Sequence, residues 1–425
     1  MAQDPKNAAK KNVRPTQPEL DKIIAKHELF RSGSAGGARA NLAHYDLSGL
    51  SLCGHDLSHA DFTGAMLVAT DFSKCKLDYS LFFAADCRDA NFREARLIRA
   101  DLRGACLRGA AMNNADLTDA DMREGAFAFY DPDKGLSFAS DNPEWKEGSG
   151  GVDMRGATLS SAKLSGAIAT NSNFEDANLS KVTFSRGDLS GANLSGANLI
   201  GADLSTCVLK NVNLRGANLV GVKMDVTGLV NVDMSGALTD KPMGKTVAEL
   251  AVPLEKLVHE HKLWLDSKGA QGQRLDLQGY DLRGIVPFGR IDLTMFLAEE
   301  TVWNAFDFSR LNIQASRFGK SDLRACLFDA ADMRGGHFQK ANMVGTKLRK
   351  VFLNPLVIDG NRILKSNFSE ANLRYADFTG ANLREVNFSK ADLSSADFTG
   401  ADITGADFQD AVIENTKIDL SKAKK

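Results

Sequence analysis

Residues 391–410 read ADLSS, ADFTG, ADITG and ADFQD, so that a large apolar residue recurs at every fifth position. A period of five fits neither the 3.6-residue period of an α-helix nor the two-residue period of a β-strand. A short fixed repeat is instead typical of proteins in which each unit contacts only its neighbours. The stretch therefore predicts a solenoid built from five-residue units.

The same unit extends over most of the 425 residues. We take the large apolar residue as the centre of each unit. The centres then keep one register from 42 to 127, from 154 to 234 and from 308 to 418, and two single units are centred on 277 and 282. Together these make 60 units, or 300 residues. A register of this length indicates one architecture for nearly the whole chain.

The other positions of the unit also follow a pattern. A small residue, usually alanine, lies two places before the centre, aspartate or asparagine lies between them, and glycine often closes the unit. The small and the large apolar residue can both point inward while the other three point outward. Asp, Asn, Ser and Gly favour turns, and the polar side chains among them can bond nearby backbone groups. A chain that turns a corner every five residues would close into a square coil.

In these residues the chain resembles the pentapeptide-repeat family, whose units read Ala-Asp/Asn-Leu/Phe-x-x. The resemblance implies an all-β solenoid, a right-handed quadrilateral β-helix with about four units per coil. Residues 20 apart would then stack, which places Phe368, Phe388 and Phe408 in one interior column and Phe378 and Phe398 in the opposite column. Further expected core residues are Leu42, Phe62, Phe92, Leu194 and Leu214.

A larger duplication includes the repeats. The residues LDKII and HELF within 20–30 correspond to LEKLV and HKLW within 254–264. We therefore expect a disordered basic tail at 1–17, a first module at 18–240 and a second module at 241–425. Within the modules we expect short capping α-helices at 18–31 and 253–266, β-helix segments at 40–127, 152–237 and 275–420, and a loop at 128–151.

Both leading segments have the periodicity of amphipathic helices. The ends of a solenoid expose core and unpaired strand edges, which favours lids as the role of these helices. Docking of a partner or of a second subunit is the alternative role. His27 and His261 occupy the same place in the two copies. No recognisable set of ligands or titratable groups accompanies them, so we expect packed, hydrogen-bonded histidines.

Composition excludes several classes of protein. The 52 basic and 54 acidic residues give a net charge of −2, so the chain is neither a polyanion nor a polycation. No apolar run is long enough to span a membrane, and the N-terminus lacks the apolar core of a signal peptide. The six cysteines contain no CxxC pair, which fits a reducing cytoplasm. Without a phosphate-binding loop, a nucleophile elbow or an HExxH motif, we expect no enzymatic activity, metal or cofactor.

Charge is unevenly distributed in the last third of the chain. Residues 310–365 contain 11 basic and four acidic residues, a net of +7, whereas residues 370–420 contain four basic and ten acidic residues, a net of −6. Such an arrangement could steer partners or favour head-to-tail association, and Arg324, Arg334 and Arg349 are its candidate contacts. A solvated mixed surface is the alternative.

Apolar residues also occupy positions that should face water. Ile200 and Val220 are 20 apart and would form one exposed strip, while Phe352 and Val357 replace the usual Asp or Asn, with Leu364 nearby. Exposed apolar clusters often mark interfaces, so residues 351–364 are the predicted patch for a partner or for self-association. A bulged coil that buries them is the alternative. Trp145, in the loop at 128–151, completes the candidate surface because long loops are often functional.

The leading hypothesis is a bacterial, non-catalytic scaffold that presents flat faces to an unknown protein partner. Nucleic acid is not expected, because the basic groups lack interleaved aromatic residues. The resemblance suggests an alternative, since some family members mimic a DNA duplex and bind DNA gyrase or topoisomerase IV. The near-neutral charge, and the absence of the C-terminal dimerising helix of those members, argue against it, whereas the acidic segment supports it. A regulatory or targeting module is the third possibility.

Overall fold

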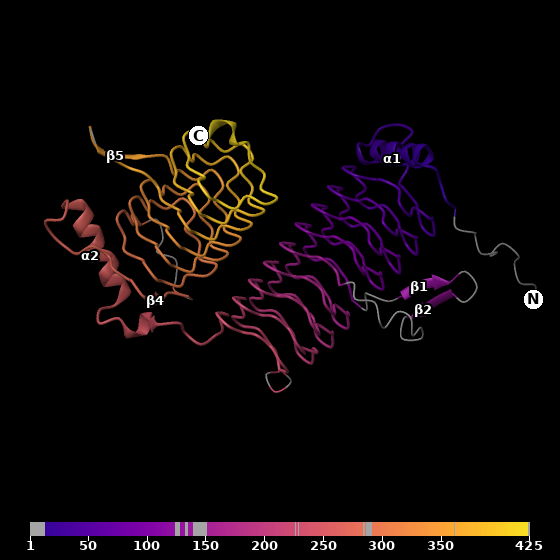
Figure 1. Ribbon diagram of the computed structural model, residues 1–425, viewed down its shortest axis with the longest axis horizontal. Coiled ribbons are helices and arrows are strands. Elements are labelled where there is room, and N and C mark those ends of the chain that lie inside the picture. Colours follow the sequence, from indigo (N-terminus) through magenta and orange to yellow (C-terminus); the bar gives the residue numbers. More distant parts are fainter. Residues whose placement is uncertain are drawn as a thin grey trace, which may run out of the picture. The chain divides into compact units, whose positions relative to one another are not determined.

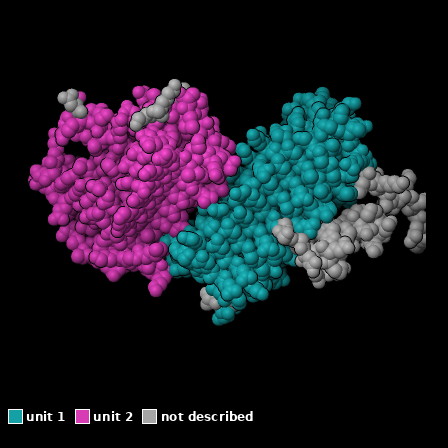
Figure 2. All heavy atoms as spheres, viewed as in Figure 1, with its two compact units in different colours: residues 1–240 teal, residues 241–425 magenta. Residues whose placement is uncertain are grey.

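A computed structural model describes residues 13–123, 128–131, 135–138, 151–225, 227, 229–283, 285, 291–360 and 362–423. The chain divides into two compact units, Met1–Asp240 and Lys241–Lys425 (Figure 2). Trp145 and residues 1–12 of the expected tail lie outside the described residues.

In both units the chain winds in coils of 20 residues. Parallel bridges join Asp61 to Leu81 and Leu81 to Asp101, and the same spacing recurs along each unit. One coil therefore contains four five-residue units, as the resemblance implied. Figure 1 shows the successive coils stacked within each unit.

In a repeat unit with Asp or Asn before the centre, every backbone N–H can have an acceptor. Three of the five donate to carbonyls of the coils before and after, and one closes the turn from the preceding unit. The fifth, directly after the centre, donates to the Asp or Asn side chain directly before the centre. In the unit 391–395 these bonds run from Ala391 N to Phe388 O (3.0 Å), Asp392 N to Ala371 O (2.9 Å), Leu393 N to Val412 O (2.8 Å), Ser394 N to Asp392 Oδ1 (3.0 Å) and Ser395 N to Glu414 O (2.7 Å).

The corner of the coil lies two residues after each centre and has a left-handed backbone. Lys74, Glu94 and Tyr375 occupy such corners, each with a φ of 58°. A residue with a Cβ in this conformation costs about 1–2 kcal/mol. The corner N–H compensates by donating to the next coil, as from Tyr375 N to Ser394 O at 3.0 Å. The corner thus depends on both a positive φ and a backbone N–H that can donate to the next coil.

The interior is filled by stacked columns of the centres. In unit 2 the ring centroids of Phe368 and Phe388 are 5.5 Å apart, those of Phe388 and Phe408 are 5.2 Å apart, and those of Phe378 and Phe398 are 4.8 Å apart. Phe408, on the last full coil, is only half-buried. In unit 1 the core includes Leu42, Phe62, Phe92, Leu194 and Leu214.

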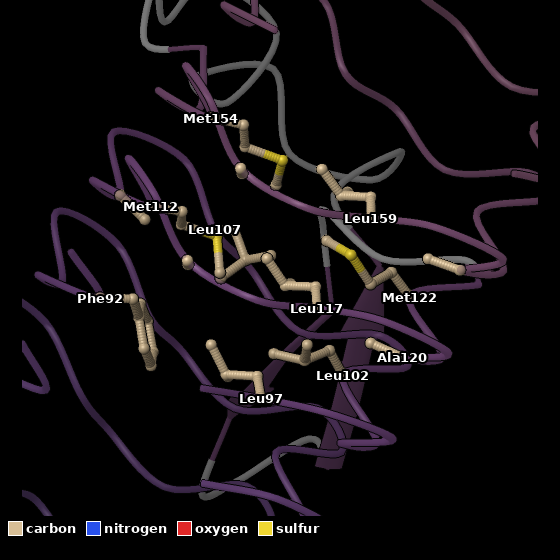
Figure 3. Close-up of a cluster of buried hydrophobic side chains, with 14 of the residues drawn as sticks. Phe92, Leu97, Leu102, Leu107, Met112, Leu117, Ala120, Met122, Met154 and Leu159 are labelled. Atoms are coloured by element: carbon tan, nitrogen blue, oxygen red, sulfur yellow. The ribbon is translucent and has the colours of Figure 1, made fainter. Parts of the chain in front are cut away.

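The core of unit 1 is continuous across the segment that interrupts the repeat. Ala111 bridges to Asp153, 42 residues away, which is 22 more than one coil. Met112 and Met154 consequently lie on consecutive coils of one core (Figure 3). Part of the inserted segment forms an antiparallel hairpin of β1 (Ala128–Asp131) and β2 (Gly135–Phe138).

Unit 2 contains an interruption that the sequence register does not reveal. His337 bridges to Asn367 and Phe352 bridges to Asn382, each 30 residues apart instead of 20. The ten extra residues contain a hairpin of β5 (Leu356–Asp359) and β6 (Arg362–Leu364). We call the stack of regular coils the wall of a unit. The interpretation of 308–418 as an unbroken wall is therefore wrong at this place. Because ten residues equal two units, the register is the same on both sides, and Phe338 stacks on Phe368 at 4.7 Å.

A helix covers the start of each unit. Helix α1 (Gln17–Arg31) buries Leu20 and Ile24 in the core of unit 1, and α2 (Leu254–Asp266) packs on the core of unit 2. Phe30, near the end of α1, is exposed. β3 (Lys245–Thr246), before α2, pairs in parallel with β4 (Tyr280–Asp281), after α2. Turns of 3-10 helix lie at Val247–Glu249 and Leu420–Lys422.

The two equivalent histidines join the helices to the first coil. Both are fully buried, and the Nδ1 atoms of His27 and His261 accept the backbone N–H of Ala40 and Leu275, each at 3.0 Å. His27 Nε2 donates to the carbonyl of Ser58 at 3.1 Å, so its ring is neutral. Burial lowers the pKa of both imidazoles below the ordinary value. Packed, hydrogen-bonded histidines were the expected reading of this position.

The bond to the Asp or Asn side chain can be tested at Asp188, whose Oδ1 accepts the N–H of Ser190 at 2.8 Å. We expect Asp188→Ala to lower the free energy of unfolding by about 1 kcal/mol, because it leaves that N–H without its acceptor. Asp188→Asn keeps an acceptor and should change stability by less than about 0.5 kcal/mol. Denaturant unfolding and amide exchange at Ser190 measure both effects, and equal loss in the two variants would contradict the account.

His27 should make stability depend on pH. Its pKa is lowered in the folded state, so the unfolded state takes up the proton first as pH falls. Its contribution is therefore complete above the unfolded pKa of about 6.5 and decreases as pH falls below that value. Thermal unfolding between pH 5 and 8 should show a weaker pH dependence in His27→Gln than in the unsubstituted protein. His259→Gln, at an exposed position of α2, is the matched control and should leave the dependence unchanged.

Candidate interaction surfaces

The β5–β6 hairpin carries the largest apolar departure from the wall. Val357, Ile358, Ile363 and Leu364 are exposed, and so is Phe352 on the coil from which the hairpin leaves. Val357 is 66% exposed and Phe352 is 48% exposed, values far from those of core residues. We call these five residues the hairpin surface. The sequence left two alternatives for the apolar residues of 351–364: exposure to solvent, or burial in a bulged coil. In the structure these five side chains are exposed.

Pro355 explains why the chain leaves the coil at this point. It lies two residues after the centre Leu353, where other units have a left-handed corner. At the same place on the preceding unit, Lys350 has a φ of 54° and donates its N–H to the carbonyl of Thr379 at 3.0 Å. Proline has a fixed negative φ and no N–H, so it can provide neither feature. The corner cannot form here, and the chain continues into β5.

The base of the hairpin is fixed to the coil before it. Leu356 pairs with Leu364 across the two strands. Both pack on Gly335, where an added Cβ would lie 2.9 Å from the Cβ of Leu364 and 3.3 Å from that of Leu356. The N–H of Gly335 donates to Ser366 Oγ at 3.1 Å, and that hydroxyl donates to the carbonyl of Leu353 at 2.9 Å. Side-chain packing and hydrogen bonds thus hold the element in place.

The other face of the hairpin has no such support. Val357 pairs with Ile363, and side chains alternate along a strand, so this pair points away from Gly335. At the tip, the guanidinium of Arg362 forms an ion pair with the carboxylate of Asp359. At the base, Lys365 Nζ lies 2.8 Å from Glu385 Oε2. The hairpin therefore presents apolar side chains bordered by two cations and two anions.

The three arginines expected at the surface differ in accessibility. Arg334 and Arg349 are partly exposed and bind Asp332 and Asp329 through their guanidinium groups. Arg324 is only 5% exposed and is not available to a partner. Its guanidinium is tied to Asp322, two residues earlier in the same unit, and lies along the wall.

The change of net charge near residue 370 is less pronounced on the folded surface than along the sequence. Lysines of the basic segment pair with carboxylates of the acidic segment on the next coil. The pairs are Lys340 with Glu370 (3.4 Å), Lys347 with Asp377 (3.7 Å) and Lys365 with Glu385 (2.8 Å). Residues 30 or 20 apart in sequence are neighbours on the wall, so the boundary between the segments is neutralised locally.

The remaining expected surface residues lie in unit 1. Ile200 and Val220 are on consecutive coils, since Gly201 N donates to the carbonyl of Val220 at 2.9 Å, and both are half-buried. They form a strip that is less exposed than expected. Trp145 lies outside the described residues.

A surface on unit 1 was not anticipated. Tyr79 is 44% exposed and Phe83 is 38% exposed. Arg99 lies over the ring of Tyr79 and donates to its hydroxyl at 3.1 Å, and the guanidinium carbon of Arg103 lies 5.6 Å from the ring centroid of Phe83. Each arginine is 20 residues after its aromatic partner. Aligning the sequence in rows of 20 would have revealed this aromatic–arginine surface, made of Tyr79, Phe83, Arg99 and Arg103.

Features of a reactive centre are scarce in the part of the chain that the structure describes. No three or more His, Cys, Asp or Glu residues in it are grouped so that they could hold a metal ion. Burial raises the pKa of the Cys75 thiol to about 12, which keeps it protonated and unreactive at neutral pH. None of the described helices combines the length and apolarity needed to cross a membrane.

Comparison with known proteins gives one match in sequence. The model of the family named pentapeptide repeats matches in eight copies, over residues 39–78, 82–123, 150–186, 188–225, 307–354, 366–405 and 382–419. No curated protein matches the chain.

Several solved structures are similar over part or most of the chain. QnrB1, a plasmid-mediated fluoroquinolone resistance protein, is 18% identical over 54% of this chain and 97% of its own, with a TM-score of 0.27. HetL, a pentapeptide repeat protein involved in heterocyst differentiation regulation in Nostoc sp. strain PCC 7120, is 20% identical over 93% of both chains, with a TM-score of 0.11. Rfr23 from Cyanothece 51142 is 29% identical over 31% of this chain and 88% of its own, with a TM-score of 0.17.

The hairpin should be removable without loss of the fold. Deleting residues 356–365 together with Pro355→Gly joins Leu353 to Ser366 through one standard corner. We expect this variant to keep its far-UV circular dichroism spectrum and to unfold within about 3 °C of the full chain, because the core columns keep their register.

Deleting only residues 356–363 is the control, since it moves every later centre off its column. This second variant should lose cooperative unfolding of unit 2. Equal stability of the two deletions would contradict the role given to the ten-residue length.

Proposed function

The chain belongs to the pentapeptide-repeat family, and on that premise we propose that it is a non-catalytic scaffold that binds protein partners through its outer faces. The observation that carries this proposal is the hairpin surface. Five large apolar side chains are exposed on and beside an element that adds nothing to the core. Apolar clusters of this kind mark interaction sites on soluble proteins.

The hairpin is not required by the fold. The coil closes elsewhere with a five-residue unit and a left-handed corner, and Phe338 stacks on Phe368 as though the insertion were absent. Exposing Val, Ile, Leu and Phe side chains to water is unfavourable by about 25 cal/mol per Å². A function that covers these side chains accounts for an element that the wall does not need.

The aromatic–arginine surface supports the same proposal from unit 1. Tyrosine and arginine are enriched among the residues that dominate binding energy at protein interfaces. Arg99 and Arg103 hold the two aromatic rings by cation–π contact, so little side-chain freedom would be lost on binding. Each unit would then offer one partner surface.

The proposal includes the finer architecture. We propose that the coils form a right-handed quadrilateral β-helix, supported by parallel bridges between residues 20 apart and by four units per coil. We also propose that the two units are copies of one plan. His27 and His261, which accept the amides of Ala40 and Leu275 at equal distances, support this duplication.

The DNA-mimicking alternative has less support. It depends on the acidic segment 370–420, and the carboxylates of Glu370, Asp377 and Glu385 in that segment are paired with lysines of the preceding coil. A regulatory or targeting role is compatible with a scaffold and would be decided by the identity of the partner.

The hairpin surface can be tested by affinity purification of the full chain from native lysate. Val357→Asp combined with Ile363→Asp should reduce the recovery of co-purified proteins at least about tenfold, because it places charge in an apolar contact. Val412→Asp, at another exposed apolar position of unit 2, is the matched control and should bind normally.

All variants should unfold at the temperature of the unsubstituted protein. Unchanged recovery with the double variant would overturn the proposal for this surface. Inhibition of gyrase supercoiling by the purified chain would instead favour the DNA-mimicking alternative.

A further inference from the structure

We propose that β6 of the hairpin pairs with β6 of a second copy of this chain, so that two hairpins form one four-stranded antiparallel sheet. The inference rests on the proposed function, because it names a partner for the hairpin surface. It is carried by the free edge of β6, by the charges around it and by the size of the apolar surface.

The outer edge of β6 is unpaired within one chain. The sheet consists of β5 and β6 alone, and no backbone hydrogen bond outside the hairpin joins residues 362–364 to another described residue. A two-stranded sheet is marginally stable in water, and a third strand with an apolar face stabilises it. An apolar free edge is also a template for another strand, which natural proteins usually block.

The two edges of the hairpin are not equivalent. Pro355 directly precedes β5, and a proline beside an edge removes a donor and discourages pairing. Neither β6 nor Lys365 after it contains a proline. The open edge of the sheet is therefore the edge of β6.

The sequence of β6 suits pairing with itself. In an antiparallel pair about a two-fold axis centred on Ile363, this side chain lies beside Ile363 of the partner subunit. Arg362 then lies opposite Leu364 of the partner subunit. No like charges face each other across the pair, which avoids the destabilisation that directly opposed like charges cause.

The charges around the hairpin surface favour a copy over a strongly charged partner. Arg362 with Asp359 and Lys365 with Glu385 give two cations and two anions, a net of zero. A surface without net charge can meet its own copy without repulsion. It offers no electrostatic gain to an acidic or a basic partner, since each of its charges already has an opposite neighbour.

The apolar area matches one side of a dimer interface. With roughly 150–200 Å² for each whole side chain, the exposed fractions of the five residues correspond to about 400 Å². A standard interface buries about 800 Å² on each partner, of which about 56–58% is apolar, or about 450 Å². The hairpin surface is thus of the size that a stable pair of copies requires.

Cysteine cross-linking of the full chain tests the geometry. Directly opposed residues of an antiparallel pair have Cα atoms about 4.5–5.5 Å apart, within the range of a disulfide. Ile363→Cys should therefore form a covalent dimer under mild oxidation. Val357→Cys is the matched control, because Val357 lies on the outer strand of the same hairpin and its two copies would be too far apart to bond. The unsubstituted protein, which has an exposed Cys53, sets the background.

Sedimentation velocity of the same proteins tests the oligomeric state. We expect a dimer for the full chain and dimerisation at least about 100-fold weaker for the variant lacking residues 356–365 with Pro355→Gly. Cross-linking through position 357 but not 363, or a dimer that persists in the deletion variant, would overturn β6 pairing.

Failure of this pairing can be told apart from failure of the proposed function. A monomeric full chain whose Val357→Asp, Ile363→Asp variant still loses co-purified proteins would overturn self-pairing and leave the scaffold intact. A monomer whose recovery of partners is unchanged by that variant would overturn both.

Discussion

In most repeat units the N–H after the centre donates to the Asp or Asn side chain before it, and the regular wall depends on this hydrogen bond wherever such a residue is present. In a unit such as 391–395 the neighbouring coils and the turns supply carbonyl acceptors for four of the five amides, and the fifth amide donates to the Asp side chain. A buried donor without an acceptor costs about 1–3 kcal/mol, so an Asp or Asn side chain that accepts this N–H stabilises its unit. Aspartate is abundant here because the backbone requires it. The acidic content of the chain is therefore no indication of catalysis.

The unit centred on Leu353 lacks this bond and also lacks a left-handed corner. Phe352 replaces the acceptor, and two residues after the next centre Pro355 removes both the left-handed corner and its amide. The wall loses two of its regular hydrogen bonds within four residues, at the place where the hairpin surface begins. Arginines such as Arg334 instead add hydrogen bonds to a unit, because they bind the carboxylate of that unit and reinforce its corner. Some outward-facing residues thus stabilise their own unit, whereas others, such as Phe352, are available for contact with a partner.

The sequence was sufficient for the family, the coil of 20 residues, the stacked phenylalanines and the buried histidines of the two helices. The hairpin could not be predicted, because an insertion of two whole units leaves the five-residue period unchanged. Ile358 and Ile363 occupy positions of centres and yet are exposed. The burial of Arg324 could not be predicted from the sequence either, because it depends on how the side chain lies along the wall. The aromatic–arginine surface exists only between residues 20 apart, as with Tyr79 and Arg99, and a linear reading does not bring them together.

The ten-residue length of the hairpin insertion also bears on how such a chain can change over time. Because the core columns on both sides keep their phase, a surface element of this length can be gained or lost in one step without any compensating change in the interior. Moving it by 20 residues would displace it by one strand spacing, about 4.8 Å, and keep it on the same side of the coil. The 22-residue insertion in unit 1 shows that a segment that is not a multiple of five is tolerated when its ends meet consecutive coils. Partner choice in this architecture can therefore change by adding or relocating such insertions, while the packing of the interior stays the same.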